Sequence, residues 1–598
     1  FEIARRHDLP AVSVMDQNGV MNEQAGKYTG MDRFECRKQI VADLESQGLL
    51  EKIEDYQHGV GHCYRCQTVV EPSLSKQWFV SVKPLAEEAI EAVKTGKTRI
   101  HPKTWENTYY DWMYNIPDWC ISRQIWWGHQ IPAWTCQDCG ELIVSETDPT
   151  ECTKCNSSKL VQETDVLDTW FSSALWPFST LGWPDETKEL KTFYPTSVLI
   201  TSFDILFFWV ARMMMMGLHF MKEVPFRDVY LHALVRDKHG QKMSKSKGNV
   251  MDPLLVMDKY GTDALRFTMT AFAAQGRDIR LSEERIEGYR YFINKIWNAA
   301  RFALLHIRES HPTPVEEIDP QNLSLPHQWI LSRTNHTIGE VHKALNDYRF
   351  NDAAHTLYQF VWHEFCDWYL EWLKDVLYGD DELAKATGQG VLFALLEIIL
   401  KLLHPITPFV TEEIWSVLPG DRSSIMTESF PEEVDGWNNP EADAAAELLM
   451  GVVTGLRNIR SETGIHPSAR IEGFVICPVK DKAAVLKNNS KAVRERARIE
   501  ELHVLQEGKR PQGAASYIFN EIEIYVPLAG LVDIAQEMAK LEREKDKVTK
   551  QLAKVEGKLG NSKFLDNAPV EVVAKEKDKK ETFAAKLAKI IESMDMLQ

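Results

Sequence analysis

Residues 240–250 read Gly-Gln-Lys-Met-Ser-Lys-Ser-Lys-Gly-Asn-Val, and this short loop decides the fold class. The apolar run over residues 229–235 predicts a strand before the loop, and residues 253 to about 270 predict a helix after it. Two lysines three residues apart, Lys242 and Lys245, can place two ammonium groups along a polyphosphate, where negative charge develops during transfer at an α-phosphate. A solvated basic loop is the alternative for any lysine cluster, but the strand–loop–helix context favours phosphate binding.

The composition bounds the class of protein. A chain of 598 residues suggests about four domains, and 44% hydrophobic with 26% charged residues is typical of a globular protein. The net charge of −18 argues against a wholly basic nucleic-acid binder but leaves local basic patches open. The apolar run 205–220 contains Arg212 and a histidine, which favours a buried helix over a membrane span.

The opening residues bear on completeness and location. Residues 1–7 are typical of the middle of a helix without a cap, so we expect the chain to be a fragment that starts inside a domain. No signal-peptide pattern is visible, and we expect a cytoplasmic protein.

Six of the ten cysteines form Cys-x-x-Cys pairs, a spacing typical of metal sites in a reducing compartment. Two pairs separated by twelve residues can complete a tetrahedral zinc site, and four thiolates leave no open position for catalysis. Two reduced pairs without metal are the alternative. The third pair, Cys63 and Cys66, has no second pair within reach, and we expect no complete site there. The predicted zinc ligands are Cys136, Cys139, Cys152 and Cys155.

Two segments dense in tryptophan, residues 118–132 and 165–176, precede the lysine loop. They indicate either a ligand pocket or a well-packed core with satisfied polar groups. Farther along, Asp204 lies at the start of an apolar helix, where the helix dipole favours a carboxylate and the carboxylate could accept hydrogen bonds from a ribose. Ile205 and Trp209 are four residues apart and share one helix face.

The second half of the chain is mostly helical. Over residues 282–470, aromatic residues recur at three and four, which is typical of a bundle core. Arg457 and Arg460 share one helix face and could meet phosphates, although the residues alone do not decide for RNA. Residues 471–527 alternate short apolar runs with charged helices and predict a small α/β module.

The last seventy residues predict an antiparallel helical hairpin with a coiled-coil seam, because apolar residues repeat at three and four on both sides of a turn. Residues 528–598 hold 14 Lys+Arg against 13 Asp+Glu, a net charge of +1 on an otherwise acidic chain. An arm that contacts an RNA backbone through Lys547, Lys550 and Lys554 is one interpretation. A solvated coiled coil or a dimerisation arm is the other.

Taken together, these strings closely resemble the valyl-tRNA synthetases of bacterial type, a family of class I aminoacyl-tRNA synthetases, over essentially all 598 residues. The resemblance implies a partial Rossmann-type α/β catalytic core, an all-α anticodon-binding bundle and a C-terminal antiparallel coiled coil that contacts tRNA. It implies that valine and ATP, with Mg²⁺, form valyl-adenylate and pyrophosphate, and that the valyl group then passes to tRNA(Val). A monomer and no membrane are expected.

The resemblance also implies roles for single residues. Lys242 and Lys245 act on the phosphates as the catalytic pair, and one residue departs from the family pattern, since Ser202 stands where the family has glycine. A glycine there would let the backbone approach the nucleotide closely. The implied ATP-binding residues are Asp204, Lys242, Ser244 and Lys245, and the implied walls of the valine pocket are Trp170, Ile205 and Trp209.

One signature of the family is absent from this sequence. The chain has no His-x-Gly-His, and residues 58–62 only approximate it with the wrong spacing. Half of the nucleotide site is therefore expected to be missing, and the chain alone to be inactive. A valine pocket cannot strongly reject the isosteric threonine, a limit known from the valine enzymes themselves, so the complete protein is expected to edit mischarged threonine at a second site.

We therefore expect six segments and keep two other interpretations open. An isoleucyl-type synthetase is the alternative within the class, and a non-catalytic tRNA-binding fragment is the alternative outside it. The expected segments are an editing-domain remnant (1–70), a catalytic-core insertion with the zinc knuckles (71–195), the second half of the Rossmann-type domain with the lysine loop (196–281), the anticodon-binding bundle (282–470), the small α/β module (471–527) and the tRNA-binding arm (528–598).

Overall fold

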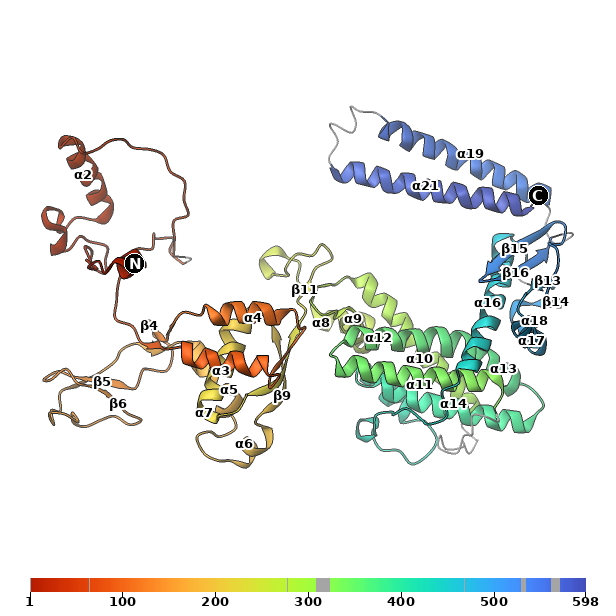
Figure 1. Cartoon of the computed structure of the whole chain (residues 1–598), viewed down its shortest axis with the longest axis horizontal. Coiled ribbons are helices and arrows are strands. Elements are labelled where there is room, and N and C mark those ends of the chain that lie inside the picture. Colours follow the sequence, from red (N-terminus) through yellow and green to blue (C-terminus); the bar gives the residue numbers. More distant parts are fainter. Residues whose placement is uncertain are drawn as a thin grey trace. The chain divides into compact units, whose positions relative to one another are not determined.

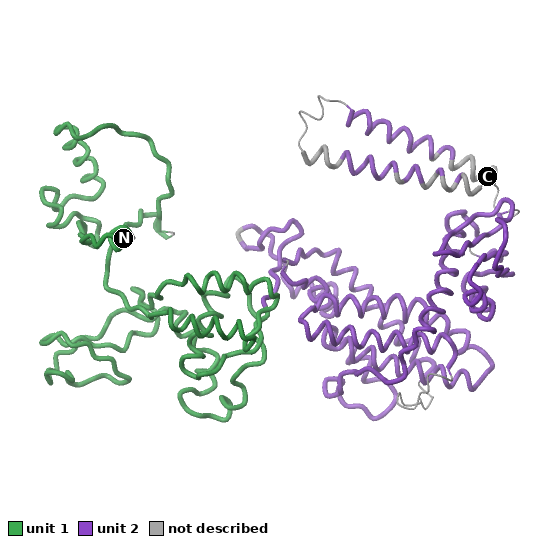
Figure 2. The backbone as a smooth tube through the Cα atoms, in the orientation of Figure 1, with its two compact units in different colours: residues 1–230 green, residues 231–598 purple. Residues whose placement is uncertain are grey.

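The fold is taken from a computed structural model, which describes residues 2–63, 65–276, 278–307, 323–466, 468–528, 534–560 and 570–597. The chain divides into two compact units, Phe1–Tyr230 and Leu231–Gln598 (Figure 2). Each unit has its own core and is described by itself.

The first eighty residues of unit 1 form little packed structure. Helix α1 (Glu2–His7) is followed by a 3₁₀ segment η1 (Glu23–Tyr28) and by α2 (Arg33–Ser46), which is labelled in Figure 1. The Asp32 carboxylate caps the first turn of α2 and lies 2.8 Å from the Phe34 amide. Among the described residues from 3 to 81, only Gly19 and Cys36 are buried. This segment therefore has no hydrophobic core of its own.

The α/β part of unit 1 is built on a three-stranded sheet in the order β2-β10-β9, in which β2 and β10 are parallel. The strands β9 and β10 are joined by a crossover through α7, whose four consecutive methionines are buried. This sheet and its covering helices (Figure 1) confirm the predicted Rossmann-type class. Their bounds are β2 (Arg99–His101), β9 (Thr196–Ser202), β10 (Phe226–His232), α3 (Lys83–Lys94), α4 (Trp105–Tyr114), α5 (Thr169–Ser179), α6 (Lys188–Phe193) and α7 (Ala211–Met221).

Three local predictions were wrong in their bounds. The strand predicted over 229–235 ends at His232, and a separate strand β11 (Val235–Arg236) pairs in parallel with β12 (Ile279–Arg280). The single helix predicted from 253 to 270 is two helices, α8 (Pro253–Tyr260) and α9 (Thr262–Phe272), because Gly261 between them has a φ of +93°.

The third wrong prediction concerns the start of the apolar helix near Asp204. Strand β9 extends to Ser202, and a 3₁₀ turn η2 (Phe203–Ile205) and a π-helical turn η3 (Leu206–Val210) precede α7. π-turns occur frequently at functional sites.

Short antiparallel strands complete unit 1. Strands β5, β6 and β7 form a sheet in the order β6-β5-β7, and β1 with β3 and β4 with β8 form two further two-stranded sheets. The strands are β1 (Phe79–Val80), β3 (Trp119–Cys120), β4 (Ser122–Arg123), β5 (Ala133–Cys136), β6 (Leu142–Val144), β7 (Leu160–Gln162) and β8 (Val166–Leu167).

Unit 2 contains a helical bundle with one large apolar core (Figure 1). Of the six aromatic residues of the predicted repeat, Phe365, Tyr369 and Trp372 are buried in this core, and Tyr358, Trp362 and Trp368 pack against it partly buried. Two helical stretches of the described chain, 203–221 and 382–403, are long and apolar enough to cross a membrane; the second is 72% buried here, so this is weak evidence for a span. The helices are α10 (Glu283–Ile307), α11 (Leu325–Asn346), α12 (Phe350–Tyr358), the π-helical η7 (Gln359–Tyr369), α13 (Leu370–Leu377), α14 (Glu382–Leu403), α15 (Pro408–Trp415) and α16 (Pro440–Glu462).

A small α/β module follows the bundle. Its sheet has the order β14-β13-β16-β15, and the second half of α16 packs into its core through Leu456 and Ile459. The predicted module therefore shares a helix with the bundle. Its elements are β13 (Ile471–Ile476), α17 (Lys480–Asn488), α18 (Ser490–Ala497), β14 (Ile499–Leu505), β15 (Ala514–Phe519) and β16 (Ile522–Pro527).

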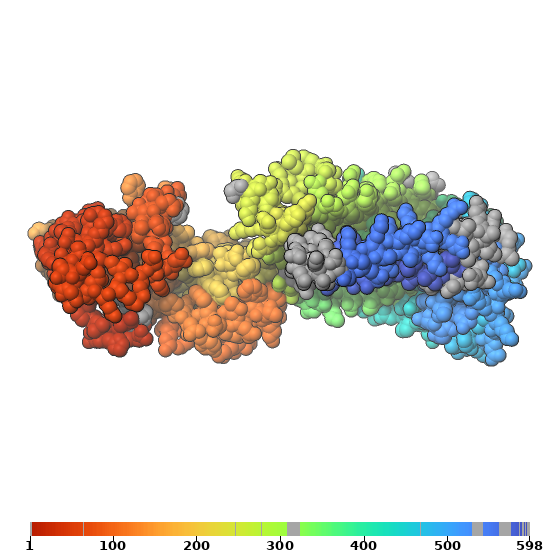
Figure 3. Space-filling model, turned by 90° about the horizontal axis from the view of Figure 1, so that it is seen from above, coloured from red at the N-terminus to blue at the C-terminus, as the bar shows by residue number. Residues whose placement is uncertain are grey.

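The C-terminal region is a pair of helices, α19 (Ile534–Leu559) and α21 (Val570–Leu597), which lie side by side (Figure 1). Val548 and Met594 are buried between them. The first apolar residue of the predicted repeat, Leu531, lies outside the described residues. In the space-filling view of Figure 3, the described residues of α19 and α21 are drawn in blue.

Candidate functional site

The lysine loop of unit 2 is built around Asp237. The Asp237 Oδ1 atom accepts hydrogen bonds from the amides of His239 (3.0 Å) and Gln241 (2.8 Å), and Gly240 takes a φ of +79° to close the turn. Arg236 and Lys242 then form an isolated antiparallel bridge. The sequence between β11 and Lys242 is thus a tight hairpin that fixes where the loop begins.

Asn249 closes the other end of the loop. Its side-chain oxygen accepts a hydrogen bond from the Ser244 amide (2.9 Å), and its side-chain nitrogen donates to Asp237 Oδ2 (2.9 Å). The Asn249 amide, followed by the Gln241 backbone amide, holds the pKa of Asp237 below its usual value. One carboxylate and one amide therefore order the whole loop.

The two predicted catalytic lysines are exposed. Within the described residues neither Lys242 nor Lys245 forms an ion pair with an acidic side chain. Lys245 begins a 3₁₀ turn η4 (Lys245–Lys247), which ends at Gly248 with a φ of +64°. Both ammonium groups are available to an anionic ligand, and their action on phosphates stays a prediction.

The three predicted walls of the valine pocket lie in unit 1. Trp170 is on α5, Ile205 ends η2 and Trp209 is on η3; all three are half-buried. The Trp209 indole donates to the Ser173 carbonyl (3.1 Å), so α5 and η3 are in contact. The structure brings the three elements together, and the pocket's ligand stays a prediction.

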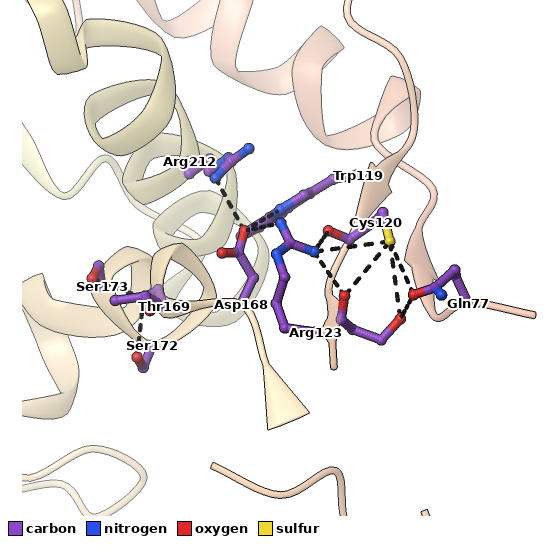
Figure 4. Close-up of polar contacts among 10 residues, drawn as sticks. Gln77, Trp119, Cys120, Arg123, Asp168, Thr169, Ser172, Ser173 and Arg212 are labelled. Atoms are coloured by element: carbon purple, nitrogen blue, oxygen red, sulfur yellow. Dashed lines mark hydrogen bonds and ion pairs between the residues drawn. The ribbon is translucent and has the colours of Figure 1, made fainter. Parts of the chain in front are cut away.

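A buried charge cluster next to these walls was missed from the sequence (Figure 4). Asp168, immediately before α5, accepts a hydrogen bond from the Trp119 indole (3.0 Å) and forms ion pairs with Arg123 (3.0 Å) and Arg212 (3.5 Å). Its side chain is only 8% exposed. The carboxylate therefore joins β3, β4, α5 and α7.

Arg212 is also largely buried, with 12% of its side chain exposed. Its guanidinium lies over the Trp119 ring, 4.0 Å from the centroid, and burial lowers its pKa. The sequence did carry a signal, because an arginine within an apolar helical run needs a buried partner. The sequence could not say which of many carboxylates that partner is.

The proposed ribose segment is exposed. The Asp204 amide donates to the Ser202 hydroxyl at 3.3 Å, and the Asp204 side chain faces solvent. Ser202, which replaces the glycine of the family pattern, thus caps η2. Ribose binding by Asp204 is not tested by these contacts.

The four cysteines predicted as zinc ligands converge. Their sulfur atoms all lie within 4.8 Å of one another, with Cys136–Cys155 and Cys139–Cys152 at 3.6 Å. Four sulfurs around one zinc at about 2.3 Å lie about 3.8 Å apart, so this donor set fits a tetrahedral site. The backbone amide of Cys139 lowers the pKa of Cys136 to about 6, which favours the thiolate form of this one sulfur.

Arg457 and Arg460 do not share one environment. Arg460 is 8% exposed, and its guanidinium donates to the carbonyls of Arg498, His466 and Ala469. The prediction that it meets phosphate is therefore corrected: it ties α16 to the small module. Arg457 is exposed and donates to the Arg496 carbonyl, so its contact with RNA stays a prediction.

The lysines predicted to bind tRNA, Lys547, Lys550 and Lys554, are exposed on α19. Nearby, Lys558 is 3.6 Å from Glu576 on α21. These lysines are placed on an accessible helix, and their ligand is not shown.

The fold and the loop are those of a class I tRNA synthetase. A model of class I tRNA synthetases (I, L, M and V) matches residues 14–282, and one of the anticodon-binding domain of tRNA ligases matches 327–475. A third model, the tRNA-binding arm of valyl-tRNA synthetases, matches 533–598.

Similarity to known proteins narrows this class to one family. The chain is 62% identical to a valine–tRNA ligase of Desulfotalea psychrophila over 100% of this chain and 68% of that protein. It is 56% and 53% identical to the valine–tRNA ligases of Geobacter sulfurreducens and Syntrophotalea carbinolica, with 100% of this chain and 67% and 66% of those proteins covered. The chain belongs to the valine–tRNA ligase family and spans about two thirds of the length of these relatives, which confirms the resemblance drawn from its motifs.

Proposed function

We propose that this chain carries part of a valine–tRNA ligase that forms valyl-adenylate from valine and ATP and passes the valyl group to tRNA(Val). One structural observation carries the proposal: two exposed lysines stand on a loop ordered by Asp237 and Asn249. Preorganised cations at the point where phosphate charge develops stabilise a transition state without reorganisation. The 62% identity over the full chain supports the valine specificity.

The described residues suggest a division of roles. Lys242 and Lys245, with Ser244, hold the phosphates of ATP, which binds together with Mg²⁺, and Asp204 contacts the ribose. Trp170, Ile205 and Trp209 wall a pocket that admits valine. The partly buried indoles of the two tryptophans provide apolar surface, so one missing or extra methyl group on the substrate changes its affinity.

The C-terminal part supplies RNA contacts in this proposal. The exposed lysines of α19 and Arg457 meet the tRNA backbone, and the protein acts as a monomer in the cytoplasm. Editing of mischarged threonine belongs to the complete protein.

Deleting residues 528–598 is expected to weaken tRNA binding while valine activation by the complete enzyme stays largely intact; an unchanged affinity for tRNA would count against the arm.

A valine-dependent pyrophosphate-exchange assay tests the activation step. We expect no exchange by this polypeptide alone, since its sequence lacks a His-x-Gly-His, and tight tRNA binding without exchange would favour the tRNA-binding alternative.

In a complete relative, the equivalents of Lys242→Ala and Lys245→Ala are expected to lower kcat by at least a factor of 100, as for other charge-stabilising donors. The matched control is Lys247→Ala in the same turn. An equal loss of kcat in the control would show that Lys242 and Lys245 contribute only general positive charge.

Metal analysis tests the cysteine site. We propose one structural zinc, which holds strands β5 and β7 together through the sulfurs of Cys136, Cys139, Cys152 and Cys155. About one equivalent per chain is expected, falling to near zero in Cys152→Ser and unchanged in Cys63→Ser. Well under one equivalent in the unaltered protein would refute the site.

A further inference from the structure

Two neighbouring tryptophans of unit 1 are almost wholly exposed. Trp126 is 105% exposed, Trp127 is 90% exposed, and Ile125 before them is 53% exposed. Fully burying one large apolar side chain contributes about 1.5–3 kcal/mol. These side chains contribute none of it to the fold, and exposed apolar surface of this kind marks an interaction site.

The loop that carries them is anchored at both ends. The Gln124 side chain donates to the side chains of Gln77 (3.0 Å) and Asp165 (2.7 Å). At the other end the Gln130 side chain donates to the Glu163 carbonyl (2.7 Å). The tryptophans therefore stand on a fixed segment, and a partner does not have to order it on binding.

Between the anchors the loop runs closely against β8. Gly128 has a φ of +152°, and a Cβ atom there would lie 2.9 Å from a Val166 methyl carbon. The following residue, His129, accepts a hydrogen bond from the Leu167 amide (2.7 Å) through its carbonyl. Both features fix the loop onto the strand that leads into α5.

This attachment places the tryptophans close to the pocket walls along the chain. Trp127 is two residues from His129, which is bonded to Leu167, and Leu167 is three residues from Trp170. Since a residue spans at most about 3.6 Å, Trp127 lies within roughly 25 Å of Trp170.

The surroundings favour contact with flat apolar groups rather than with phosphates. Asp165 and Glu163 flank the loop, and Arg123, which directly precedes Gln124, is paired with Asp168. A nucleic-acid backbone would be repelled here, whereas the face of a base would not. Ile125 is the exposed large apolar residue next to them in the loop, and three such side chains are few for the core of a protein interface.

We propose that Trp126 and Trp127 form a stacking platform for unpaired nucleobases at the 3′ end of an RNA. The proposal rests on the proposed function, because a tRNA must bring its unpaired 3′ end to the aminoacyl site that Trp170 walls. Unpaired RNA ends are commonly recognised by stacking on aromatic side chains. Each stacked base contributes about 1–3 kcal/mol and needs no particular sequence.

The double substitution Trp126→Ala/Trp127→Ala tests the platform in this polypeptide. Its affinity for tRNA(Val) is expected to fall roughly five- to 100-fold, whereas its affinity for the same tRNA without the unpaired 3′ nucleotides stays unchanged. Because stacking releases no counterions, the salt dependence of binding should not change. Trp126→Phe/Trp127→Phe should retain most of the affinity, and Phe193→Ala, an exposed aromatic elsewhere in unit 1, is the matched control.

A second measurement separates failure of the platform from failure of the proposed function. A short single-stranded RNA should quench tryptophan fluorescence of the unaltered chain and not of the double alanine variant. If the chain does not bind tRNA but this quenching occurs, the proposed function fails and the platform stands. Unchanged tRNA affinity together with no quenching difference overturns the platform. So does a double variant that changes only the oligomeric state or the stability, which would indicate a protein-binding surface.

Discussion

The lysine loop of unit 2 and the Asp168 cluster of unit 1 both depend on one aspartate, but they hold charge in opposite ways. Asp237 accepts hydrogen bonds from amides within twelve residues of it, and Lys242 and Lys245 on the same loop are exposed to solvent. Asp168 is buried and forms ion pairs with two arginines from distant segments. The first arrangement presents charge to a ligand, and the second uses charge to join elements.

This difference has an energetic side. Hydrogen bonds in an exposed loop contribute about 1 kcal/mol each, because water replaces them readily. A buried ion pair contributes little relative to an apolar substitute, yet removing one partner costs about 3–5 kcal/mol since the other charge stays buried. Mutations should therefore damage stability in one region and ligand binding in the other.

The largest effect is expected for Asp168→Asn. The amide oxygen can still accept the Trp119 hydrogen bond, but the guanidinium groups of Arg123 and Arg212 lose their counter-charge. Unit 1 should lose about 3–5 kcal/mol of its free energy of unfolding in urea. Asp165→Asn is the control at a more exposed carboxylate, with a change of at most about 1 kcal/mol. A loss as small as the control's would show that solvent already screens the cluster.

A double-mutant cycle should give the next effect. Arg212→Met keeps most of the side-chain volume over the Trp119 ring and removes the buried cation. Combined with Asp168→Asn, it should destabilise less than the sum of the two single changes by about 1–3 kcal/mol. Strict additivity in the same urea titration would mean that Arg123 alone balances Asp168.

The contrast between the two regions also explains what could be predicted from the sequence. The loop, the four cysteines and the bundle core follow from residues close together in the chain, so spacing and periodicity were enough. The Asp168 cluster joins segments from Trp119 to Arg212, and spacing alone says nothing about such partners. The prediction that Arg460 contacts phosphate was wrong for the same reason, because its partners are backbone carbonyls from later in the chain.

The predicted helix boundaries were wrong because of local backbone geometry. Gly261 divides the helix that follows the loop, and the π-turn η3 delays the start of α7. Neither feature changes the hydrophobic pattern, which continues across both breaks. A hydrophobic pattern with the period of a helix therefore indicates a helical region without fixing where its individual helices begin and end.

Asn249→Ala should affect function more than stability. It removes the hydrogen bonds to Ser244 and Asp237 from an exposed loop, so the free energy of unfolding should change by only about 1 kcal/mol. Pyrophosphate exchange by a complete relative with the equivalent change should fall at least tenfold, because the two lysines are no longer held in place. Normal exchange would show that ATP orders the loop without Asn249.

The smallest expected effect is the pH dependence of the loop. The pKa of Asp237 is lowered in the folded protein by the Asn249 side chain first and by the Gln241 amide second. A lowered pKa means that the carboxylate's contribution is complete above the ordinary value of 3.8 and is lost as the pH falls through the folded value. In Asn249→Ala the pKa of Asp237 should therefore move up toward 3.8, which a carboxyl titration of selectively labelled aspartate by NMR would measure. An unmoved pKa in that variant would assign the ordering of the loop to the backbone amides of His239 and Gln241 instead.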